Sequence, residues 1–329
     1  MKLKVLFAVG ALAAVVALSG CSRRKANEGP LVLGYFPNIT HAQAIVGVRD
    51  GTFQRELKGK PLKTRTFNAG PAAMEAVMAG ELDVAYVGPG PAIVAHLRSG
   101  GRVKVIAGSA SGGAGLVVKG VSGPDALAGQ RVAIPQIGNT QDIALRVWLK
   151  GQGRLDVQVT PLENPEIVNL FRQGLLKAAW VPEPWVSTLV SEGATLLVDE
   201  RTLWPGGRFP TTVLVATDEA LQHRREEVKA VLRAHLDLTR RARRDPAAFQ
   251  AAVNGGFEAL TRKRLPDAVV KEAFGRLELL TDPMTEQLRV EAEHAATLGY
   301  VPKADASKLV DASLLQEIAA EPGVGGSGP

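Results

Sequence analysis

The chain has 329 residues, a length typical of two domains, and its 46% hydrophobic and 22% charged residues are ordinary for a globular protein. This balance excludes a chain that is disordered or a coiled coil throughout. The formal net charge of +6 is too small and too diffuse to indicate a nucleic-acid-binding protein. The single cysteine, Cys21, excludes an intramolecular disulfide and a cysteine-based zinc or iron–sulfur site.

Residues 1–20 have the layout of a secretory signal peptide. A basic head containing Lys2 and Lys4 precedes an uncharged apolar run of 14 residues, Val5 to Leu18. A bilayer-spanning helix needs about 20 residues, so this run is too short to cross a membrane. The small residues before Cys21 resemble a bacterial lipobox, which predicts cleavage there and lipidation of the thiol; a plain signal peptide with a chance cysteine is the alternative.

These features predict an extracytoplasmic protein that is lipid-anchored to a bacterial membrane, in the periplasm or at the cell surface. Residues 21–29 are polar and are expected to form a tether. This location disfavours enzymes that depend on ATP or NAD(P)H.

Short apolar strands then alternate with helices. We predict strands at 31–35, 62–67, 82–87 and 103–108, with helices at about 41–48, 71–80 and after Pro91. Thr40 is the predicted N-cap of the first helix. This alternation predicts a parallel sheet with helices on both faces.

The pattern recurs in the second third of the chain. Strands are predicted at 131–135, 157–160 and 178–181, and helices begin near 140 and 164. A shift of 94 residues places Pro71 on Pro165 and Gly80 on Gly174. Chance alignment of two strand–helix units is the alternative explanation.

The recurrence predicts two similar α/β lobes that face each other across a ligand cleft. We expect lobe I to comprise 30–110 and 213–320 and lobe II 111–212, with crossovers near 109–116 and 210–213 and a disordered tail at 321–329. The glycine-rich run 112–115 precedes an apolar stretch and no helix, so we interpret it as a flexible crossover and not as a dinucleotide loop.

The loops that follow the predicted strands should meet at one edge of each sheet. Several of them begin helices, whose free N–H groups and partial positive charge suit an anion. The candidate ligand-binding residues in these loops and strand ends are Thr40, His41, Asn68, Ala69, Gly70, Tyr86, Gly88, Asn139, Thr140, Gln141, Trp180, Glu183 and Trp185.

These candidates predict a small ligand whose anionic head is held by neutral donors. Tyr86, Trp180 and Trp185 are expected to form apolar or stacking walls, and Glu183 to pair with an amine on the ligand. Each candidate residue also has an alternative role that involves no ligand. A polar residue before a helix can serve only as a cap, a tryptophan can belong to the core, and Glu183 can be an exposed turn residue.

The sequence carries no known catalytic motif: it lacks Gly-x-Ser-x-Gly, His-Glu-x-x-His, a phosphate-binding loop and Cys-x-x-Cys. We therefore assign no catalytic residue, no metal site and no cofactor, and predict that the protein is not an enzyme. Residues 226–244 form a basic amphipathic pattern, which we interpret as a solvated helix with one buried stripe; contact with a membrane or nucleic acid is the alternative.

Three segments, 67–71, 80–86 and 178–185, resemble those of the substrate-binding lipoproteins of ABC importers for nitrate, taurine and aliphatic sulfonates. The resemblance extends over about residues 30–240. It implies a type II periplasmic-binding-protein fold whose lobes close on an oxyanion, with ligand contacts at 68–70, 86–88, 139–141 and 183–185. Lys177 departs from the aspartate usual in that family.

The resemblance also implies partners: an ABC permease with its ATPase, a small anionic or zwitterionic ligand, no nucleic acid, and a monomeric state. An aliphatic sulfonate or taurine is the expected ligand, and nitrate or a thiamine-type pyrimidine precursor is the alternative. A more remote alternative is an enzyme related to the pyrimidine-precursor synthases, which use a lysine Schiff base and a cysteine-rich motif; the secretion signal and the cysteine-free body disfavour it.

Overall fold

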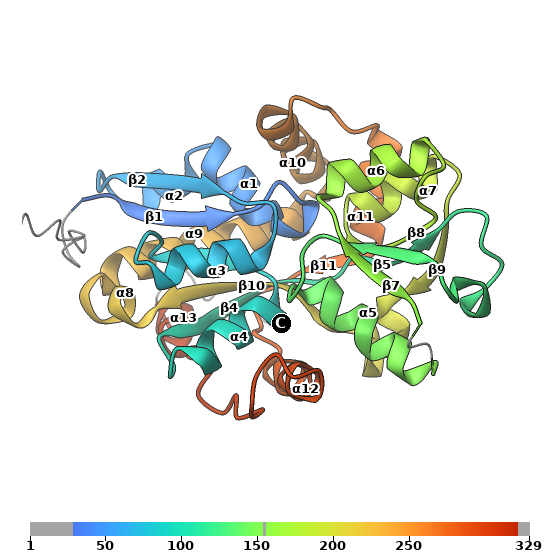
Figure 1. Ribbon diagram of the computed structural model, residues 1–329. Helices are drawn as coiled ribbons and strands as arrows, with labels where there is room; N and C mark the ends of the chain where they lie inside the picture. The colour runs from blue at the N-terminus through green and yellow to red at the C-terminus, as the bar shows by residue number, and fades with distance from the viewer. Residues whose placement is uncertain (1–28, 154–155, 322–329) are drawn as a thin grey trace, which may run out of the picture.

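The computed structural model describes residues 29–153 and 156–321 and shows two α/β lobes side by side (Figure 1). The predicted signal peptide, the lipidated Cys21, nearly all of the tether and most of the predicted tail lie outside these residues. The mixed α/β architecture with two sheets agrees with the predicted fold class.

The first lobe is built on a six-stranded sheet with the order β11-β4-β10-β3-β1-β2. Its strands are β1 (Leu31–Tyr35), β2 (Leu62–Thr66), β3 (Val84–Val87), β4 (Val103–Gly112), β10 (Pro210–Thr217) and β11 (Leu277–Leu279). Its helices are a 3-10 turn (Ile39–His41), α1 (Ala42–Arg49), α2 (Thr52–Glu56), α3 (Gly70–Met78), α4 (Pro89–Arg98), α8 (Asp218–His223), α9 (Arg225–Arg244), α12 (Thr285–Thr297) and α13 (Ser313–Ala319). The predicted N-cap is wrong, because His41 and not Thr40 immediately precedes α1.

The second lobe is built on a five-stranded sheet with the order β7-β6-β8-β5-β9. Its strands are β5 (Ala114–Val118), β6 (Arg131–Ile134), β7 (Gln158–Pro161), β8 (Ala178–Pro182) and β9 (Thr195–Asp199). Its helices are α5 (Thr140–Gly151), α6 (Asn164–Arg172), α7 (Trp185–Ser191) and three 3-10 turns (Pro124–Leu127, Glu200–Leu203 and Pro205–Gly207).

The internal repeat predicted from the sequence is visible in the element bounds. A shift of 94 residues superposes α3 on α6 at both ends, since 70 + 94 = 164 and 78 + 94 = 172. In both lobes the strand next to the sheet edge lies between two parallel neighbours: β1 pairs with β2 and β3, and β6 pairs with β7 and β8. Strand, loop and helix N-terminus therefore recur in the same relative position.

The sheets are mixed, whereas the sequence predicted parallel sheets. In the first lobe β10 lies between β3 and β4 and is antiparallel to both. In the second lobe β5 is antiparallel to β8 and to β9. These strands return from the opposite lobe, so their direction is set by the crossover and not by a strand–helix–strand unit.

The predicted flexible crossover is mostly strand. β4 extends to Gly112 in the first sheet and β5 begins at Ala114 in the second, so Gly113 alone separates them. The chain returns between β9 and β10. Two short connections thus join the lobes, which is the arrangement that permits hinge motion.

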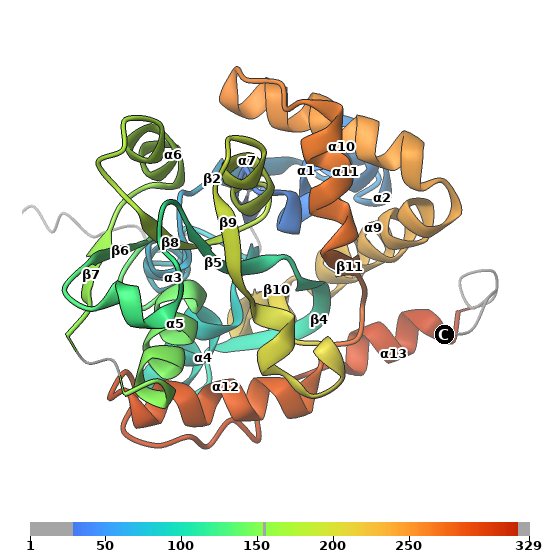
Figure 2. The ribbon, with the colours of Figure 1, turned by 90° about the vertical axis from the view of Figure 1, so that its right-hand side faces the viewer.

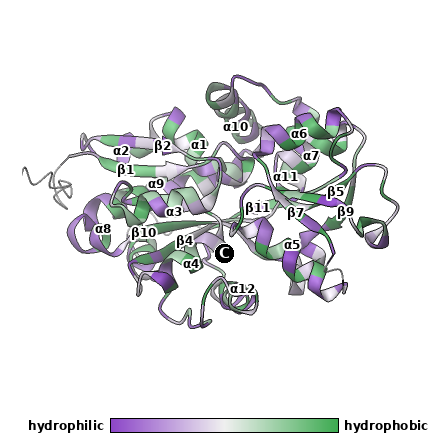
Figure 3. Ribbon diagram, in the orientation of Figure 1, coloured by the Kyte–Doolittle hydropathy of each residue, from purple (hydrophilic) through white to green (hydrophobic). Residues whose placement is uncertain are grey.

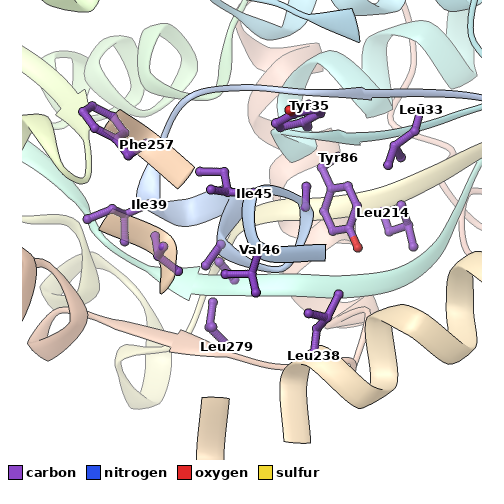
Figure 4. Packing of buried hydrophobic residues seen from close by; sticks show 14 of the residues in the cluster. Leu33, Tyr35, Ile39, Ile45, Val46, Tyr86, Leu214, Leu238, Phe257 and Leu279 are labelled. Carbon is purple, nitrogen blue, oxygen red and sulfur yellow. The ribbon is translucent and has the colours of Figure 1, made fainter. Parts of the chain in front are cut away.

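Buried apolar side chains fill both lobes, and hydrophilic residues gather on the outer faces of the helices (Figure 3). In the first lobe Leu33, Tyr86 and Leu214 from the sheet pack against Ile45 and Val46 of α1 (Figure 4). α9 buries the predicted stripe against this core, including Val231 and Leu238. This explains its amphipathic pattern without a membrane or nucleic-acid partner.

The C-terminal helices contact both lobes. α10 (Pro246–Thr261) packs against α1 and α9 of the first lobe, and α11 (Asp267–Gly275) packs against α7 of the second. α12 contacts both α4 and α5 (Figure 2). Within the described residues, no helix combines the length and hydropathy needed to cross a membrane.

Candidate functional site

A small cavity lies between the two lobes where five helices begin. Its volume is about 30 Å³, and its walls are Phe36, Asn38, Thr40, His41, Asn68, Ala69, Gly70, Gly88, Pro91, Pro135, Asn139, Thr140, Gln141, Asn164, Pro182 and Thr211. The first residue of α3, α5 and α6 and the residue before α1 and α4 all belong to this lining. One water molecule needs roughly 10–15 Å³, so the cavity suits the head group of a small ion.

The cavity attracts anions without a cationic side chain. Among the described residues, its lining contains no lysine, arginine, aspartate or glutamate. Each helix N-terminus carries roughly half a positive charge, concentrated in its first turn. The N-cap residues of α3, α4 and α6 are Ala69, Gly88 and Glu163, and none of them caps its helix with a side-chain hydrogen bond. In α4, Pro89 and Pro91 carry no N–H and the Gly90 N–H donates to Thr140, so the first-turn N–H groups left for a ligand are those of α3 and α6.

His41 faces the cavity as a neutral ring. It is 2% exposed, and burial lowers its pKa to about 3. The Phe36 backbone N–H donates to His41 Nδ1 at 3.4 Å, and the two rings lie 4.4 Å apart. Because Nδ1 accepts, the neutral imidazole carries its proton on Nε2, which makes Nε2 a hydrogen-bond donor.

The segment 139–141 serves both as a helix cap and as cavity wall. Asn139 Oδ1 accepts from the Asp142 N–H at 2.8 Å, so its oxygen caps α5. Asn139 Nδ2 donates to Gln141 Oε1 at 3.1 Å, which orients the Gln141 side chain. Asn139 can therefore cap α5 and also line the ligand cavity.

Three hydrogen bonds join the lobes around the cavity. Trp185 Nε1 of α7 donates to Asn38 Oδ1 at 2.8 Å, and Asn68 Nδ2 donates to Glu163 Oε1 at 2.5 Å. The Gly90 N–H donates to Thr140 Oγ1 at 3.3 Å. The lobes are thus in contact, and the small cavity volume is that of a closed cleft.

The closed arrangement depends on a glycine before α4. A Cβ on Gly88 would lie 2.3 Å from Thr140 Oγ1 and 3.3 Å from Thr140 Cβ. Contacts as short as 2.3 Å do not occur between a real Cβ and a neighbouring atom, so a side chain here would push α5 away from α4. The glycine therefore allows the second lobe to close on the first.

One buried polar atom at the cavity has no partner. Asn164, the first residue of α6, is 5% exposed, and its Oδ1 has no donor within hydrogen-bond distance among the described residues. Buried acceptors are nearly always satisfied in native proteins. Asn164 Oδ1 is therefore an exception that no donor of the described residues explains.

The structure brings most of the predicted site residues together. Nine of them line the small cavity: Thr40, His41, Asn68, Ala69, Gly70, Gly88, Asn139, Thr140 and Gln141. Trp185 lines a second, larger cavity next to it. Tyr86, Trp180 and Glu183 line neither cavity.

The two aromatic residues belong to the cores of their lobes, so the expectation that they form cleft walls is corrected. Tyr86 is fully buried, and its hydroxyl lies 2.9 Å from His235 Nδ1 on α9. Trp180 is fully buried beside Trp148, and its Nε1 donates to Glu200 Oε2 at 2.8 Å.

Glu183 is neither an exposed turn residue nor a wall of the cleft. Its carboxylate is fully buried and accepts from Ser187 Oγ at 2.8 Å and from the Ser187 N–H at 3.0 Å. Arg276, at the end of α11, lies 3.6 Å away and donates to Ser187 Oγ. Burial raises the pKa of Glu183 to about 7. The carboxylate thus supports the contact between α7 and α11, and the expected pairing with a ligand amine has no geometric basis.

Sequence reasoning left out several residues of the cavity wall. The repeat could have found Asn164, because a shift of 94 places the candidate Gly70 on it. Asn38 lies in a loop that the sequence placed at the strand ends. Thr211 lies in the predicted crossover 210–213, but no local pattern marked it as a ligand residue: it reaches the cavity on β10, whose insertion into the first sheet is decided by tertiary structure.

Lys177 lies away from the site. It precedes β8, whose opposite end, at Pro182, forms part of the cavity wall. Five strand residues span about 16 Å, so its charge acts weakly on a ligand in the cleft. The presence of lysine instead of the usual aspartate at position 177 therefore does not alter the cavity.

Comparison with known proteins identifies the family. The model of the NMT1-like family matches residues 24–254. The chain belongs to the NMT1-like family. A taurine-binding periplasmic protein of Escherichia coli K12 is 29% identical over 199 residues, which cover 59% of this chain and 61% of that protein. A putative binding protein of Brucella abortus is 28% identical over 213 residues, covering 63% of this chain and 65% of the relative. The chain thus matches less than two thirds of the length of these relatives.

Solved structures share the fold. The alkanesulfonate-binding protein SsuA of Xanthomonas axonopodis pv. citri, bound to MOPS, has a TM-score of 0.71 at 19% identity and covers 88% of this chain and 98% of its own. The periplasmic nitrate-binding protein NrtA of Synechocystis PCC 6803 has a TM-score of 0.73 at 17% identity and covers 90% and 91%. These matches confirm the predicted periplasmic-binding-protein fold, and with the family match they confirm the predicted resemblance.

Proposed function

We propose that this protein is the extracytoplasmic solute-binding component of an ABC importer. It captures a small oxyanion, an aliphatic sulfonate or taurine, by closure of its two lobes and delivers the ligand to a membrane permease with its ATPase. The lipid on Cys21 anchors it to the membrane, and the protein acts as a monomer without catalysis.

The observation that carries this proposal is the convergence of five helix N-termini on a neutral cavity of about 30 Å³ between the lobes. Partial positive charges and N–H donors stabilise an anion that is fully ionised and needs no counter-charge. A sulfonate head meets this requirement at every physiological pH. The relatives named for taurine and alkanesulfonate support the same ligand class.

Closure explains how capture is coupled to delivery. The interlobe bonds at Asn38, Asn68 and Gly90 surround the cavity, so the ligand can leave only when the lobes separate. The single residue between β4 and β5 allows this rotation with little backbone change. A permease that binds the closed form would then receive loaded protein selectively.

A thermal-shift screen tests the proposal. The non-lipidated body from Ser22 is heated with taurine, methanesulfonate, longer alkanesulfonates, nitrate, sulfate or hydroxymethylpyrimidine. A ligand at 100 times its dissociation constant stabilises the folded state by about 2.7 kcal/mol, which raises the melting temperature measurably. A shift with sulfonates supports the proposal. A shift with nitrate or the pyrimidine alone, or with none of these ligands, contradicts the sulfonate assignment.

The geometry of the site favours a sulfonate over a pyrimidine ligand. A pyrimidine ring needs an aromatic surface for stacking and more room than the 30 Å³ of the anion cavity. We therefore expect the sulfonates to give the larger shifts.

A further inference from the structure

Helix α12 and the segment after it are attached to the first lobe at two places. Leu288 and Ala292 of α12 are buried in the same apolar cluster as Val213 of β10. After the helix the chain returns to the first sheet, where the Val105 N–H donates to the Leu309 carbonyl at 2.9 Å. Between these two attachments the helix lies along both α4 and α5 (Figure 2). A segment of the first lobe therefore reaches the second lobe.

Tyr300 makes the polar contact between this segment and the second lobe. Its backbone carbonyl accepts from Arg98 Nη2 of α4 at 2.9 Å, which fixes its position on the first lobe. Its hydroxyl donates to Asp142 Oδ2 of α5. Burial, together with the hydrogen bond to Asp142 and the charge of Asp142, raises the pKa of Tyr300 to about 12, so the hydroxyl keeps its proton at neutral pH. We call the hydrogen bond between Tyr300 and Asp142 the latch.

Asp142 also holds the loop that precedes α5. Its carboxylate is fully buried and accepts from the Gly138 N–H at 2.7 Å and from Arg146 Nε at 2.6 Å. The Asp142 N–H in turn donates to Asn139 Oδ1 at 2.8 Å. Residues 139–141 form part of the cavity wall. The residue that accepts the latch is therefore the residue that orients this part of the wall.

Apolar side chains next to the latch also pack across the lobes. Ile143 of α5 shares a buried cluster with Ala295 of α12 and with Val301, which follows Tyr300. Ile143 and Ala295 are fully buried, and Val301 is 3% exposed. These described residues and Tyr300 lie outside the cavity lining. Separation of α5 from α12 would expose this cluster to water and break the latch in the same movement.

We propose that Tyr300 is a positioning residue for ligand capture, whose hydroxyl joins the first lobe to Asp142 and thereby holds residues 138–141 at the cavity in the closed form. This inference rests on the proposed function and goes beyond it, because it makes the release rate of the ligand depend on a residue outside the cavity. The latch forms when the lobes close. It therefore slows the departure of the ligand and leaves its entry into the open cleft unchanged.

Tyr300→Phe tests the latch, because it removes the hydroxyl and keeps the ring beside Gly138. Stopped-flow measurements use the non-lipidated body and the tightest sulfonate of the thermal-shift screen. Dissociation should be about tenfold faster in the variant, and association should stay within about twofold of the wild type. Dissociation less than about threefold faster would overturn the inference and leave the proposed function intact. Failure of every sulfonate to bind the wild type would overturn both.

Tyr86→Phe is the matched control, since it also removes a tyrosine hydroxyl that has a hydrogen-bond partner. The Tyr86 hydroxyl lies 2.9 Å from His235 Nδ1, and both residues belong to the first lobe. This variant should lose stability without a change in the dissociation rate. Equal acceleration of dissociation in the two variants would indicate general loosening of the fold and contradict the latch. Circular dichroism and melting temperatures establish that both variants fold.

A double-mutant cycle tests whether Tyr300 acts through Asp142. Asp142→Ala removes the acceptor, but Asp142 also holds the ligand loop, so the cycle and not the single variant is diagnostic. In the Asp142→Ala background, Tyr300→Phe should change the dissociation rate less than about twofold, because two residues that form one contact are not additive. Equal factors in the two backgrounds would overturn the pairing of Tyr300 with Asp142.

Discussion

Replacing Gly88 by alanine should separate ligand affinity from fold stability. Its backbone has φ −65° and ψ 150°, which alanine adopts without strain, so the effect of the new methyl is purely steric. The Cβ would lie 2.3 Å from Thr140 Oγ1 across the cleft, 1.1 Å closer than the ordinary contact limit of 3.4 Å (3.4 − 2.3 = 1.1). Opening the cleft relieves this overlap, whereas closing it does not.

The expected cost falls on the closed state. Overpacking a well-packed contact costs about 1–3 kcal/mol. If closure is coupled to binding, this range corresponds to an affinity about 5–150-fold weaker. Calorimetry with the tightest sulfonate of the thermal-shift screen measures the loss, and small-angle scattering should show a larger radius of gyration for the variant with ligand than for the wild type with ligand.

Two further variants control this prediction. Gly151→Ala places a methyl at the other end of α5, where nothing lies within 4 Å, and should bind like the wild type. Adding Thr140→Ala to Gly88→Ala removes the clashing oxygen and should recover part of the affinity, a non-additive result. Wild-type affinity in Gly88→Ala would refute the argument that closure at this contact controls binding.

Three other predictions concern buried groups. Tyr86→Phe removes the hydroxyl that is hydrogen-bonded to His235. The free energy of unfolding in urea should fall by about 1–3 kcal/mol, with sulfonate affinity unchanged. A fall in affinity without a fall in stability would show that Tyr86 contacts the ligand. Burial lowers the pKa of His41 to about 3, so this ring should leave the affinity unchanged from pH 5 to pH 8. A rise in affinity between pH 7 and pH 5 that is lost in His41→Gln would contradict this prediction. Glu291 is buried on α12, and burial raises its pKa from 4.5 to about 8. Between these pH values the folded state keeps a proton that the unfolded state releases, so stability falls as pH rises from 4.5 to 8. Glu291→Gln removes the ionisable group and with it this loss of stability. The melting temperature of the variant should match that of the wild type at pH 4.5 and exceed it at pH 8.5. An equal difference at both pH values would contradict the raised pKa of Glu291.

The sequence determined the elements around the site because their signals are local. Apolar runs mark β1, β3, β6 and β8, and proline near the start of a helix marks α3, α4 and α6. Loops that follow parallel strands share one edge of a sheet, so nine candidate residues in those loops meet in one cavity.

Tertiary structure decided which way the side chains of the strands point. Tyr86 and Trp180 lie in strands that helices cover on both faces, so no alternation of polar and apolar residues distinguishes one side from the other. Only the packing of α9 against Tyr86 and of Trp148 against Trp180 fixes them in the cores.

Tertiary structure also decided the residues that come from returning strands and from distant helices. Thr211 reaches the cavity because β10 inserts antiparallel between β3 and β4, and the larger cavity exists because α10 and α11 pack back onto α7. Such contacts join residues far apart in the chain, and they are set by the burial of whole faces rather than by any local pattern. The sequence therefore located the anion site, and the folded chain defined the space beside it.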